Sequence, residues 1–271
     1  MIRIVSILVG IGFTLALAWS FLWEVVNTSH DGLPNTVESN FHEHPKHLAL
    51  ASDGMFGKFD RQQVQRGFQV YQEVCSQCHS LRHVAYRDLK QLGYTDAEVK
   101  AIAAKAQVPA YNSATGEVKT SPGKPTDHFP PVIYGGQGNP PDLSLITKAR
   151  HGGAAYVYSI LTGYQNQPAA LLAKFPEAKT PDGLHYNPYF ANLNIAMPPP
   201  LTADEQVKYG EGNPKATVDQ MAQDVAAFLV WTAEPNLEKR HQTGWPILAF
   251  LLFATVLAYL AYRNVWADTK H

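Results

Sequence analysis

Two cysteines and a histidine stand together in the short run Cys75-Ser-Gln-Cys78-His79. They are the only cysteines among 271 residues, which excludes a disulfide framework. Two thiols at this spacing can add to the vinyl groups of one haem, and the next residue then offers its imidazole to the iron. The run therefore predicts one covalently bound haem c, with His79 as a ligand of the iron.

Two other interpretations of the run remain open. A structural zinc ion could take Cys75, Cys78 and His79 as three ligands, but such sites usually pair two separated ligand couples. The sequence contains no second cysteine pair, and the adjacent Cys78 and His79 would be poor co-ligands. A thioredoxin-like dithiol would need a βαβ context, whereas the flanking residues favour helices. Haem is the favoured interpretation.

The second axial ligand would decide the chemistry of such a haem, because a methionine sulfur closes the site and suits electron transfer. Of the four methionines, Met1 is terminal, Met55 precedes the haem motif, and Met221 lies on an apolar helix face where packing is the simpler role. Met197 differs, because the prolines 198–200 hold its loop extended and can present its thioether across a haem face. The alternative is a methionine that fills a gap in a proline-rich loop.

The motif is expected at the end of a helix over residues 60–78, with Asp60 as its N-cap. Apolar positions and both thiols recur with helical spacing along it, at Val64, Phe68, Tyr71, Cys75 and Cys78. Other helices are predicted from apolar periodicity and capping residues over residues 95–106, 143–149, 154–161 and 217–232. Three capping boxes are expected, formed by Thr95 with Glu98, Thr202 with Glu205, and Thr217 with Gln220.

The segments between these helices are rich in proline and glycine. Residues 108–141 and 164–200 are therefore expected to be long loops, and no strand alternation stands out. The predicted fold class is mostly α. Three histidines, His42, His44 and His47, precede the first helix of this region. They could bind a metal, but a solvated lead-in is the favoured interpretation.

Two uncharged apolar runs, residues 4–23 and 245–262, are long enough to cross a membrane. The first is either a retained anchor or a secretory signal with a weak cleavage site at Ala16-Leu-Ala18; its length favours the anchor. Arg3 on the inner side then places residue 30 onward outside the cytoplasm. The expected organisation is an N-terminal hydrophobic segment, a haem domain, and a C-terminal transmembrane anchor with a short cytoplasmic tail, over residues 1–27, 28–240 and 241–271.

The composition excludes two broad classes. The formal net charge is −1 with no block of like charges, so a nucleic-acid partner is not expected. Hydrophobic residues make up 45% of the chain, which is too many for a disordered protein.

With these features in place, the chain resembles the cytochrome c1 family, the haem subunits of cytochrome bc1 complexes. The resemblance covers about residues 56–265 and rests on several runs in the same order: Arg66-Gly-Phe-Gln-Val-Tyr-Gln-Glu-Val-Cys-Ser-Gln-Cys-His-Ser80, Val84-Ala-Tyr-Arg-Asp-Leu89, Pro140-Pro-Asp-Leu-Ser144, Ala149-Arg-His-Gly-Gly153, Tyr156 to Tyr164, Tyr186-Asn-Pro-Tyr-Phe190, the Met197 loop, Asp224 to Trp231, and Ala233-Glu-Pro235. Several independent runs are more specific than the haem motif alone.

The resemblance implies a class I cytochrome c-like haem domain with long Pro/Gly-rich loops. It implies His79 and Met197 as axial ligands of one covalently bound haem c. It suggests that Arg150 faces a haem propionate, where a guanidinium can fork onto a carboxylate; an ordinary surface ion pair is the alternative. Three further residues would line the haem pocket: Pro141, Ile146 and Tyr156.

The resemblance also implies a place in a bacterial respiratory chain. The haem domain would stand in the periplasm on the inner membrane, beside cytochrome b, in a complex that is dimeric. It would take electrons from a Rieske iron–sulfur protein and give them to a soluble or membrane-tethered cytochrome c, with no substrate bond broken at this haem. The rival hypothesis is a membrane-anchored haem subunit of a terminal oxidase or reductase.

The chain departs from the family pattern in two internal runs, and a retained N-terminal anchor would also be unusual for the family. The run Ile133-Tyr-Gly-Gly-Gln-Gly-Asn139 replaces an Ala/Arg/Asn-rich stretch and is shortened. Ala154 and Ala155 stand where the family often has acidic residues.

Overall fold

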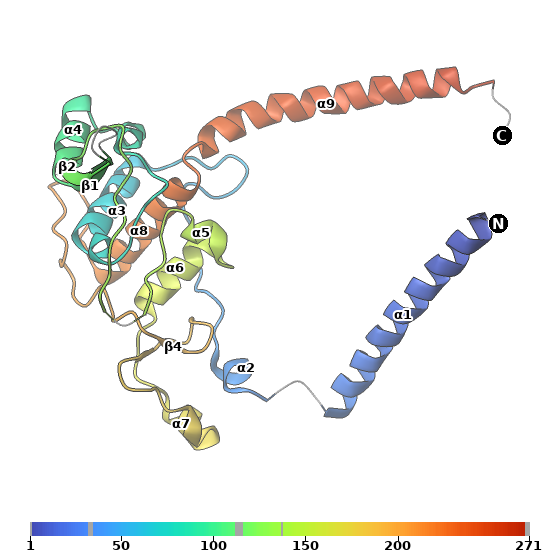
Figure 1. Cartoon of the computed structure of the whole chain (residues 1–271), viewed down its shortest axis with the longest axis horizontal. Coiled ribbons are helices and arrows are strands. Elements are labelled where there is room, and N and C mark those ends of the chain that lie inside the picture. The colour runs from blue at the N-terminus through green and yellow to red at the C-terminus, as the bar shows by residue number, and fades with distance from the viewer. Residues whose placement is uncertain (1, 32–34, 112–115, 137, 269–271) are drawn as a thin grey trace. The chain divides into compact units, whose positions relative to one another are not determined.

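The computed structural model describes residues 2–31, 35–111, 116–136 and 138–268. It is mostly helical, as predicted, with two short antiparallel hairpins (Figure 1). The α-helices are α1 (Ile2–Asp31), α2 (Val37–Phe41), α3 (Arg61–Glu73), α4 (Asp96–Ala104), α5 (Ile146–Ala149), α6 (Gly153–Thr162), α7 (Ala169–Lys174), α8 (Val218–Ala233) and α9 (Leu237–Val265). The 3₁₀ helices are η1 (Cys75–Gln77), η2 (Tyr86–Leu92) and η3 (Pro176–Ala178), and the strands are β1 (Gln107–Tyr111), β2 (Val118–Pro122), β3 (His185–Tyr186) and β4 (Asn194–Ile195).

Helices α3 and α8 pack closely against each other in the apolar core. A Cβ added at Gly67 would lie 2.0 Å from the Asp224 carbonyl oxygen and 2.7 Å from the Phe228 Cβ. Only glycine therefore allows the two helices to approach this closely without a shift of one of them. The predicted N-caps are confirmed, since the Asp60 carboxylate accepts bonds from the start of α3 and the Thr217 hydroxyl from the start of α8.

Aromatic side chains fill the core around this crossing. The Phe68 and Phe228 ring centroids lie 5.4 Å apart, and Tyr86 lies 4.3 Å from Phe129 in a loop after β2. Trp231 is almost fully buried, and its indole N–H donates to the Gln91 side chain at 3.2 Å. These contacts join helices α3 and α8 to η2 and the following loops in one apolar core.

Several predicted boundaries are corrected by the structure. The helix expected over residues 60–78 ends at Glu73, and the one expected over 143–149 is only the short α5. The two expected loops contain the β1–β2 and β3–β4 hairpins and α7. The Thr202–Glu205 capping box is wrong: no helix follows, Glu205 has φ +59°, and the Thr202 N–H donates to Gln206.

The capping box at Thr95 and Glu98 is confirmed at the start of α4. In the same way the apolar face predicted for residues 217–232 is buried along α8. These two predictions succeeded because both rest on local hydrogen bonds and helical periodicity, which distant segments do not alter.

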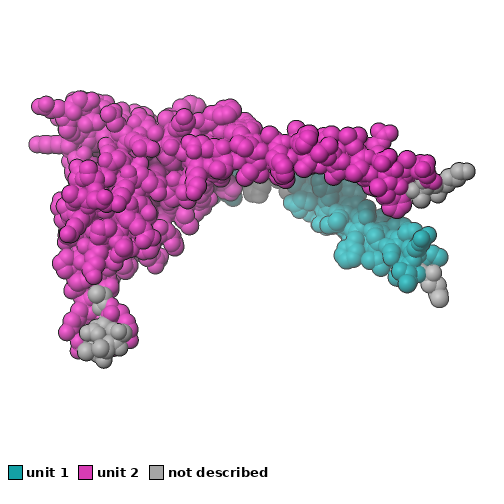
Figure 2. Space-filling model, turned by 90° about the horizontal axis from the view of Figure 1, so that it is seen from above, with its two compact units in different colours: residues 1–42, 167–179 teal, residues 43–166, 180–271 magenta. Residues whose placement is uncertain are grey.

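The chain divides into two compact units, shown in teal and magenta in Figure 2. The smaller unit contains residues 1–42 and 167–179. Within it, the Lys174 ammonium donates to the Asn40 amide oxygen, and the Phe41 and Phe175 rings meet edge to face at 6.4 Å. The larger unit, residues 43–166 and 180–271, carries the candidate site described below.

Two helices are long and apolar enough to cross a membrane by length and composition. The qualifying segments are Ile2–Ser29 of α1 and the whole of α9. Their apolar side chains are largely exposed within the chain, unlike those of a core helix.

Candidate functional site

One cavity of about 680 Å³ in the larger unit is lined by all eight residues proposed from the sequence. They come from four separate parts of the chain: Cys75, Cys78, His79, Pro141, Ile146, Arg150, Tyr156 and Met197. The remaining wall is mainly apolar and includes Leu143, Val157, Ile160, Val225 and Leu229. The structure brings the proposed residues together, although their individual roles stay predictions.

A tight turn after α3 presents both thiols. Helix α3 ends at Glu73, and Cys75 then begins the 3₁₀ turn η1, in which the Cys78 N–H donates to the Cys75 carbonyl at 3.1 Å. A 3₁₀ helix has about three residues per turn, so side chains at i and i+3 project from the same side. The turn η1 therefore presents Cys75 and Cys78 to one cavity.

The His79 imidazole is oriented by a contact with Pro141, another residue that lines the cavity. Its Nδ1 lies 2.8 Å from the Pro141 carbonyl oxygen, which can only accept, so Nδ1 carries the proton. Nε2 is then left with a free lone pair, the form that binds a metal ion. Burial lowers the pKa of His79, and the bond to Pro141 opposes that shift only in part.

Hydrogen bonds between residues 80–83 and 141–144 hold Pro141 in place. The Ser80 carbonyl accepts from the Leu143 N–H at 2.9 Å, and the Asp142 carboxylate accepts from the Arg82 N–H at 2.9 Å. Burial alone would raise the pKa of Asp142, but the bonds from Arg82 and Ser144 outweigh it and lower the pKa. The two segments therefore position His79 and its acceptor together.

Met197 follows the short β3–β4 hairpin and precedes three prolines. The Tyr164 hydroxyl donates to the Met197 carbonyl oxygen at 3.0 Å, which ties this loop to the end of α6. Tyr164 itself is partly buried, and burial raises its pKa, so the hydroxyl remains a donor at neutral pH. This hydrogen bond holds the loop that carries Met197 at the cavity.

The buried Asn187 fixes the hairpin that carries Met197. Its side-chain amide donates to the Ile160 carbonyl at 2.8 Å, and its side-chain oxygen accepts from the Tyr189 N–H at 3.1 Å. Its own N–H donates to the carbonyl of Leu193, a buried residue with φ +65°. This network explains the Tyr-Asn-Pro-Tyr-Phe run as a support for the Met197 loop.

Arg150 lies at the exposed edge of the cavity. Its guanidinium donates to the Ala149 carbonyl at 3.2 Å, and no carboxylate of the described residues forms an ion pair with it. Burial raises the pKa of the neighbouring Tyr156, and the positive charge of Arg150 opposes that shift. An unpaired guanidinium beside an apolar cavity can bind an anionic group of a ligand.

The two cysteines do not resemble a reactive dithiol. Both are free in the structure, and burial raises the pKa of Cys75 to about 12. A redox-active pair needs a readily formed thiolate, which burial disfavours. Within the described part of the chain, no group of three or more His, Cys, Asp and Glu side chains could hold a metal ion.

The residues present fit a haem. The cavity volume falls within the ~300–1,000 Å³ that is usual for cofactor sites. An imidazole nitrogen, a thioether and two thiols are the donor set of a haem c with two protein ligands. The apolar walls and one edge cation match a flat apolar macrocycle that carries carboxylates.

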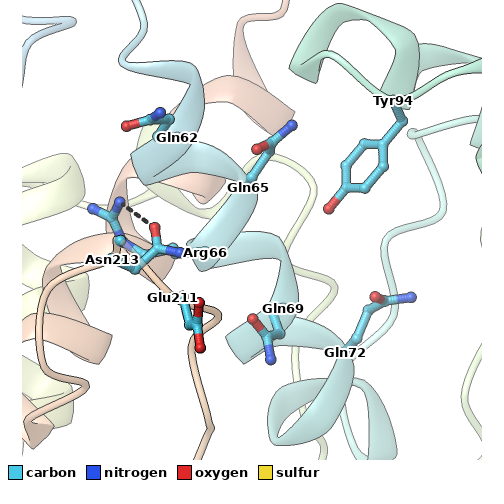
Figure 3. Close-up of a pocket in the computed structure, with 9 residues that line it drawn as sticks. Gln62, Gln65, Arg66, Gln69, Gln72, Tyr94, Glu211 and Asn213 are labelled. Carbon is cyan, nitrogen blue, oxygen red and sulfur yellow. Dashed lines mark hydrogen bonds between the residues drawn. The ribbon is translucent and has the colours of Figure 1, made fainter.

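A second cavity, of about 440 Å³, lies along the outer side of α3 and has a different character (Figure 3). It is lined by amide and charged side chains, among them Gln62, Gln65, Gln69 and Gln72. In Figure 3 the Arg66 guanidinium donates to the Asn213 side chain, at 3.3 Å. None of the proposed haem residues lines this second cavity.

Residues that support the ligands were not assigned from the sequence. Tyr71 donates to the His79 carbonyl at 2.9 Å, and Tyr164 and Asn187 hold the Met197 loop. All three lie inside runs that carried the family resemblance, and membership of those runs was the only sequence feature that could have indicated their supporting role. Gln137, in the run that departs from the family pattern, lies outside the described residues.

The chain is similar to known proteins over most of its length. A family model described as the Cytochrome C1 family matches residues 50–269. The chain is 42% identical over 240 residues to a protein named cytochrome c1 of Rhodospirillum rubrum, covering 80% of this chain and 86% of that protein. It is 40% identical over 272 residues to a mitochondrial cytochrome c1 haem protein of Arabidopsis thaliana, covering 97% and 82%. It is 39% identical over 236 residues to the cytochrome b-c1 complex catalytic subunit of Candida albicans, covering 84% and 79%.

Proposed function

Because the chain belongs to the cytochrome c1 family, we propose that it accepts single electrons from a Rieske iron–sulfur protein and passes them to a c-type cytochrome. The family makes it a haem subunit of the bc1 complex. The observation that carries the proposal is one apolar cavity lined by Cys75, Cys78, His79 and Met197.

The residues of the cavity have separate tasks. Cys75 and Cys78 would hold a haem c through thioether bonds, and His79 Nε2 and the Met197 sulfur would bind its iron. When bound, this group supplies one-electron chemistry between ferric and ferrous iron. His79 donates to the Pro141 carbonyl and Tyr164 donates to the Met197 carbonyl, and these bonds keep both ligands in place when the charge changes.

One edge of the cavity reaches the surface, which suits exchange of electrons with a docked protein. Gln77, Pro141 and Arg150 are exposed there, whereas Ile146 and Val157 close the interior. A partner could thus approach the edge of the group without entering the apolar cavity. Water is kept from the ligands by the same apolar wall.

The proposed setting is a bacterial inner membrane with the haem domain in the periplasm. Helix α9 follows the haem domain directly and is long and apolar enough to span the bilayer. Cytochrome b would flank this helix in a dimeric complex, and α1 would be a retained second anchor. The proposed organisation is residues 1–27, 28–240 and 241–271 for the N-terminal segment, haem domain and C-terminal anchor.

Purification from membranes tests the proposed function. The chain should be red, keep its haem on a denaturing gel, and co-purify with cytochrome b and a Rieske protein identified by mass spectrometry. A Cys78→Ala variant should lose one thioether bond, while a Ser76→Ala variant should keep both. Co-purification with terminal-oxidase subunits instead would favour the rival hypothesis, and a colourless zinc protein would contradict both.

Replacing Arg150 by alanine tests its proposed role beside a haem propionate. The positive charge of Arg150 favours the reduced haem, so its removal should lower the midpoint potential. Each tenfold change in this one-electron equilibrium corresponds to about 59 mV. Arg150→Lys keeps the charge but not the planar bidentate donor group, so its midpoint potential should fall less than that of Arg150→Ala. Redox titration of both variants measures this, and an unchanged potential and absorption spectrum in Arg150→Ala would contradict the role.

A further inference from the structure

A short loop of the haem domain is held against the first turns of α9. The loop is Gly54-Met-Phe-Gly57, and the His241 Nδ1–H donates to the Gly57 carbonyl at 3.2 Å. Just after the loop, the Phe59 N–H donates to the Glu238 carboxylate at 2.9 Å. A Cβ at Gly57 would lie 2.1 Å from the Ser52 carbonyl oxygen, so the loop is folded tightly back on itself.

The two apolar side chains at the tip of this loop point away from the protein core. Met55 is 61% exposed and Phe56 is 75% exposed. The Phe56 ring stacks on Trp245 of α9, with centroids 5.5 Å apart and planes at 21°. Large exposed apolar side chains that are held in place by the backbone mark a contact with something outside the chain.

Two observations indicate that this contact is lipid. Trp245 is the first residue of the uncharged run that continues to Tyr262, so it lies at the depth where the apolar part of α9 begins. Tryptophan is enriched at that depth of a bilayer, and a ring stacked on it shares the depth. Lys58 and Lys239 are exposed nearby and form no ion pair within the described part of the chain. Their charges complement the phosphates of lipid headgroups.

We propose that Met55, Phe56 and Trp245 form an interfacial cluster that inserts into the headgroup boundary of the periplasmic leaflet of the inner membrane. The proposal rests on the membrane anchoring by α9 proposed above. Anchoring by α9, with or without α1, joins the haem domain to the membrane only through the connections to these helices. A direct contact of the loop with the bilayer would fix the height and tilt of the haem edge above the membrane, where mobile redox partners must reach it.

Spin labels attached at single cysteines test this placement. The two native cysteines of this chain would be taken up by the proposed haem, and labelling the complex that lacks an introduced cysteine measures the background from other subunits. The purified complex carrying Phe56→Cys is labelled and placed in vesicles of phosphatidylcholine and phosphatidylglycerol. Collision rates with oxygen, which concentrates in lipid, and with a nickel chelate, which stays in water, are then measured. Because Phe56→Cys removes the stacked ring, Met55→Cys provides a second label with the stack intact.

Labels at two control positions calibrate the collision rates for lipid and for water. Leu252→Cys on α9 is 69% exposed within the chain and should report lipid, and Val118→Cys on β2 is 65% exposed and should report water. The labels at Met55 and Phe56 should favour oxygen over nickel by at least tenfold relative to Val118. Nickel collisions like those at Val118, or shielding from both reagents by a protein surface, would overturn the proposal. If Leu252 also reports water, the anchoring by α9 fails instead.

Discussion

Replacing Met197 by leucine should lower the haem midpoint potential by at least ~100 mV, a part of the ~0.8 V range that axial ligands cover. The thioether stabilises ferrous iron, and leucine has a similar volume but no donor atom. Because a tenfold change in a one-electron equilibrium is 59 mV, this shift would make the ferrous form about fiftyfold less favoured. Redox titration followed by absorbance measures it, together with loss of the six-coordinate spectrum.

A matched control separates ligation from packing. Met221 is fully buried on α8 and does not line the cavity. Met221→Leu should therefore change stability slightly and leave the potential where it was. If Met197→Leu behaves like Met221→Leu, the thioether is only a filler of the proline-rich loop and another group must complete the site.

The chemistry of the site could be predicted because its residues are chemically distinctive. Few side chains other than cysteine form thioether bonds, and the spacing of Cys75 and Cys78 already limits the ligands they can share. Met197 could be selected among the four methionines because the other three have simpler roles and because the prolines 198–200 hold its loop extended. What brings Met197 to the same cavity as His79 is long-range, since it depends on hydrogen bonds of Asn187 and Tyr164 to partners far away in sequence.

The exact end of α3 could not be predicted, because helical spacing continues through the motif. Positions 75 and 78 fit both an α-helix and a 3₁₀ turn, which share the i, i+3 relation. The choice is made by contacts outside the helix, including the Tyr71 hydroxyl that donates to the His79 carbonyl. The failed capping box at Thr202 has a similar cause. Its pattern was local, but in the structure the Glu205 N–H donates to the Ala216 carbonyl, and the Asp204 carboxylate accepts from the Val218 N–H at the start of α8.

The charged pair Arg66–Asp224 shows a feature that local patterns do not reveal. Both residues belonged to runs of the family resemblance, yet nothing in their spacing indicated contact. In the structure the Arg66 guanidinium forks onto the Asp224 carboxylate at 2.8 and 3.1 Å, beside Gly67 where α3 and α8 cross. Burial alone would lower the pKa of Arg66, but the bond to Asp224 and its charge raise it.

Replacing Arg66 by methionine should destabilise the haem domain by ~3–5 kcal/mol, the usual effect of leaving a buried charge without its partner. The Asp224 side chain is 0% exposed; it would lose both bonds from the guanidinium and keep the bond from the Gln220 amide at 2.9 Å, which carries no positive charge. The free energy of unfolding of the whole chain in detergent, from guanidinium titrations followed by haem absorbance and circular dichroism, measures the effect.

Two further variants distinguish a buried charge from a lost packing contact. Arg66→Met combined with Asp224→Leu removes both charges and should recover most of the lost stability, because no unpaired carboxylate remains. Lys119→Met breaks an exposed pair with Glu117 and should change stability by less than ~1 kcal/mol. If the double variant is as unstable as Arg66→Met alone, then the aliphatic stem of Arg66 and its contact with the Tyr209 ring, rather than its charge, stabilise the crossing of α3 and α8.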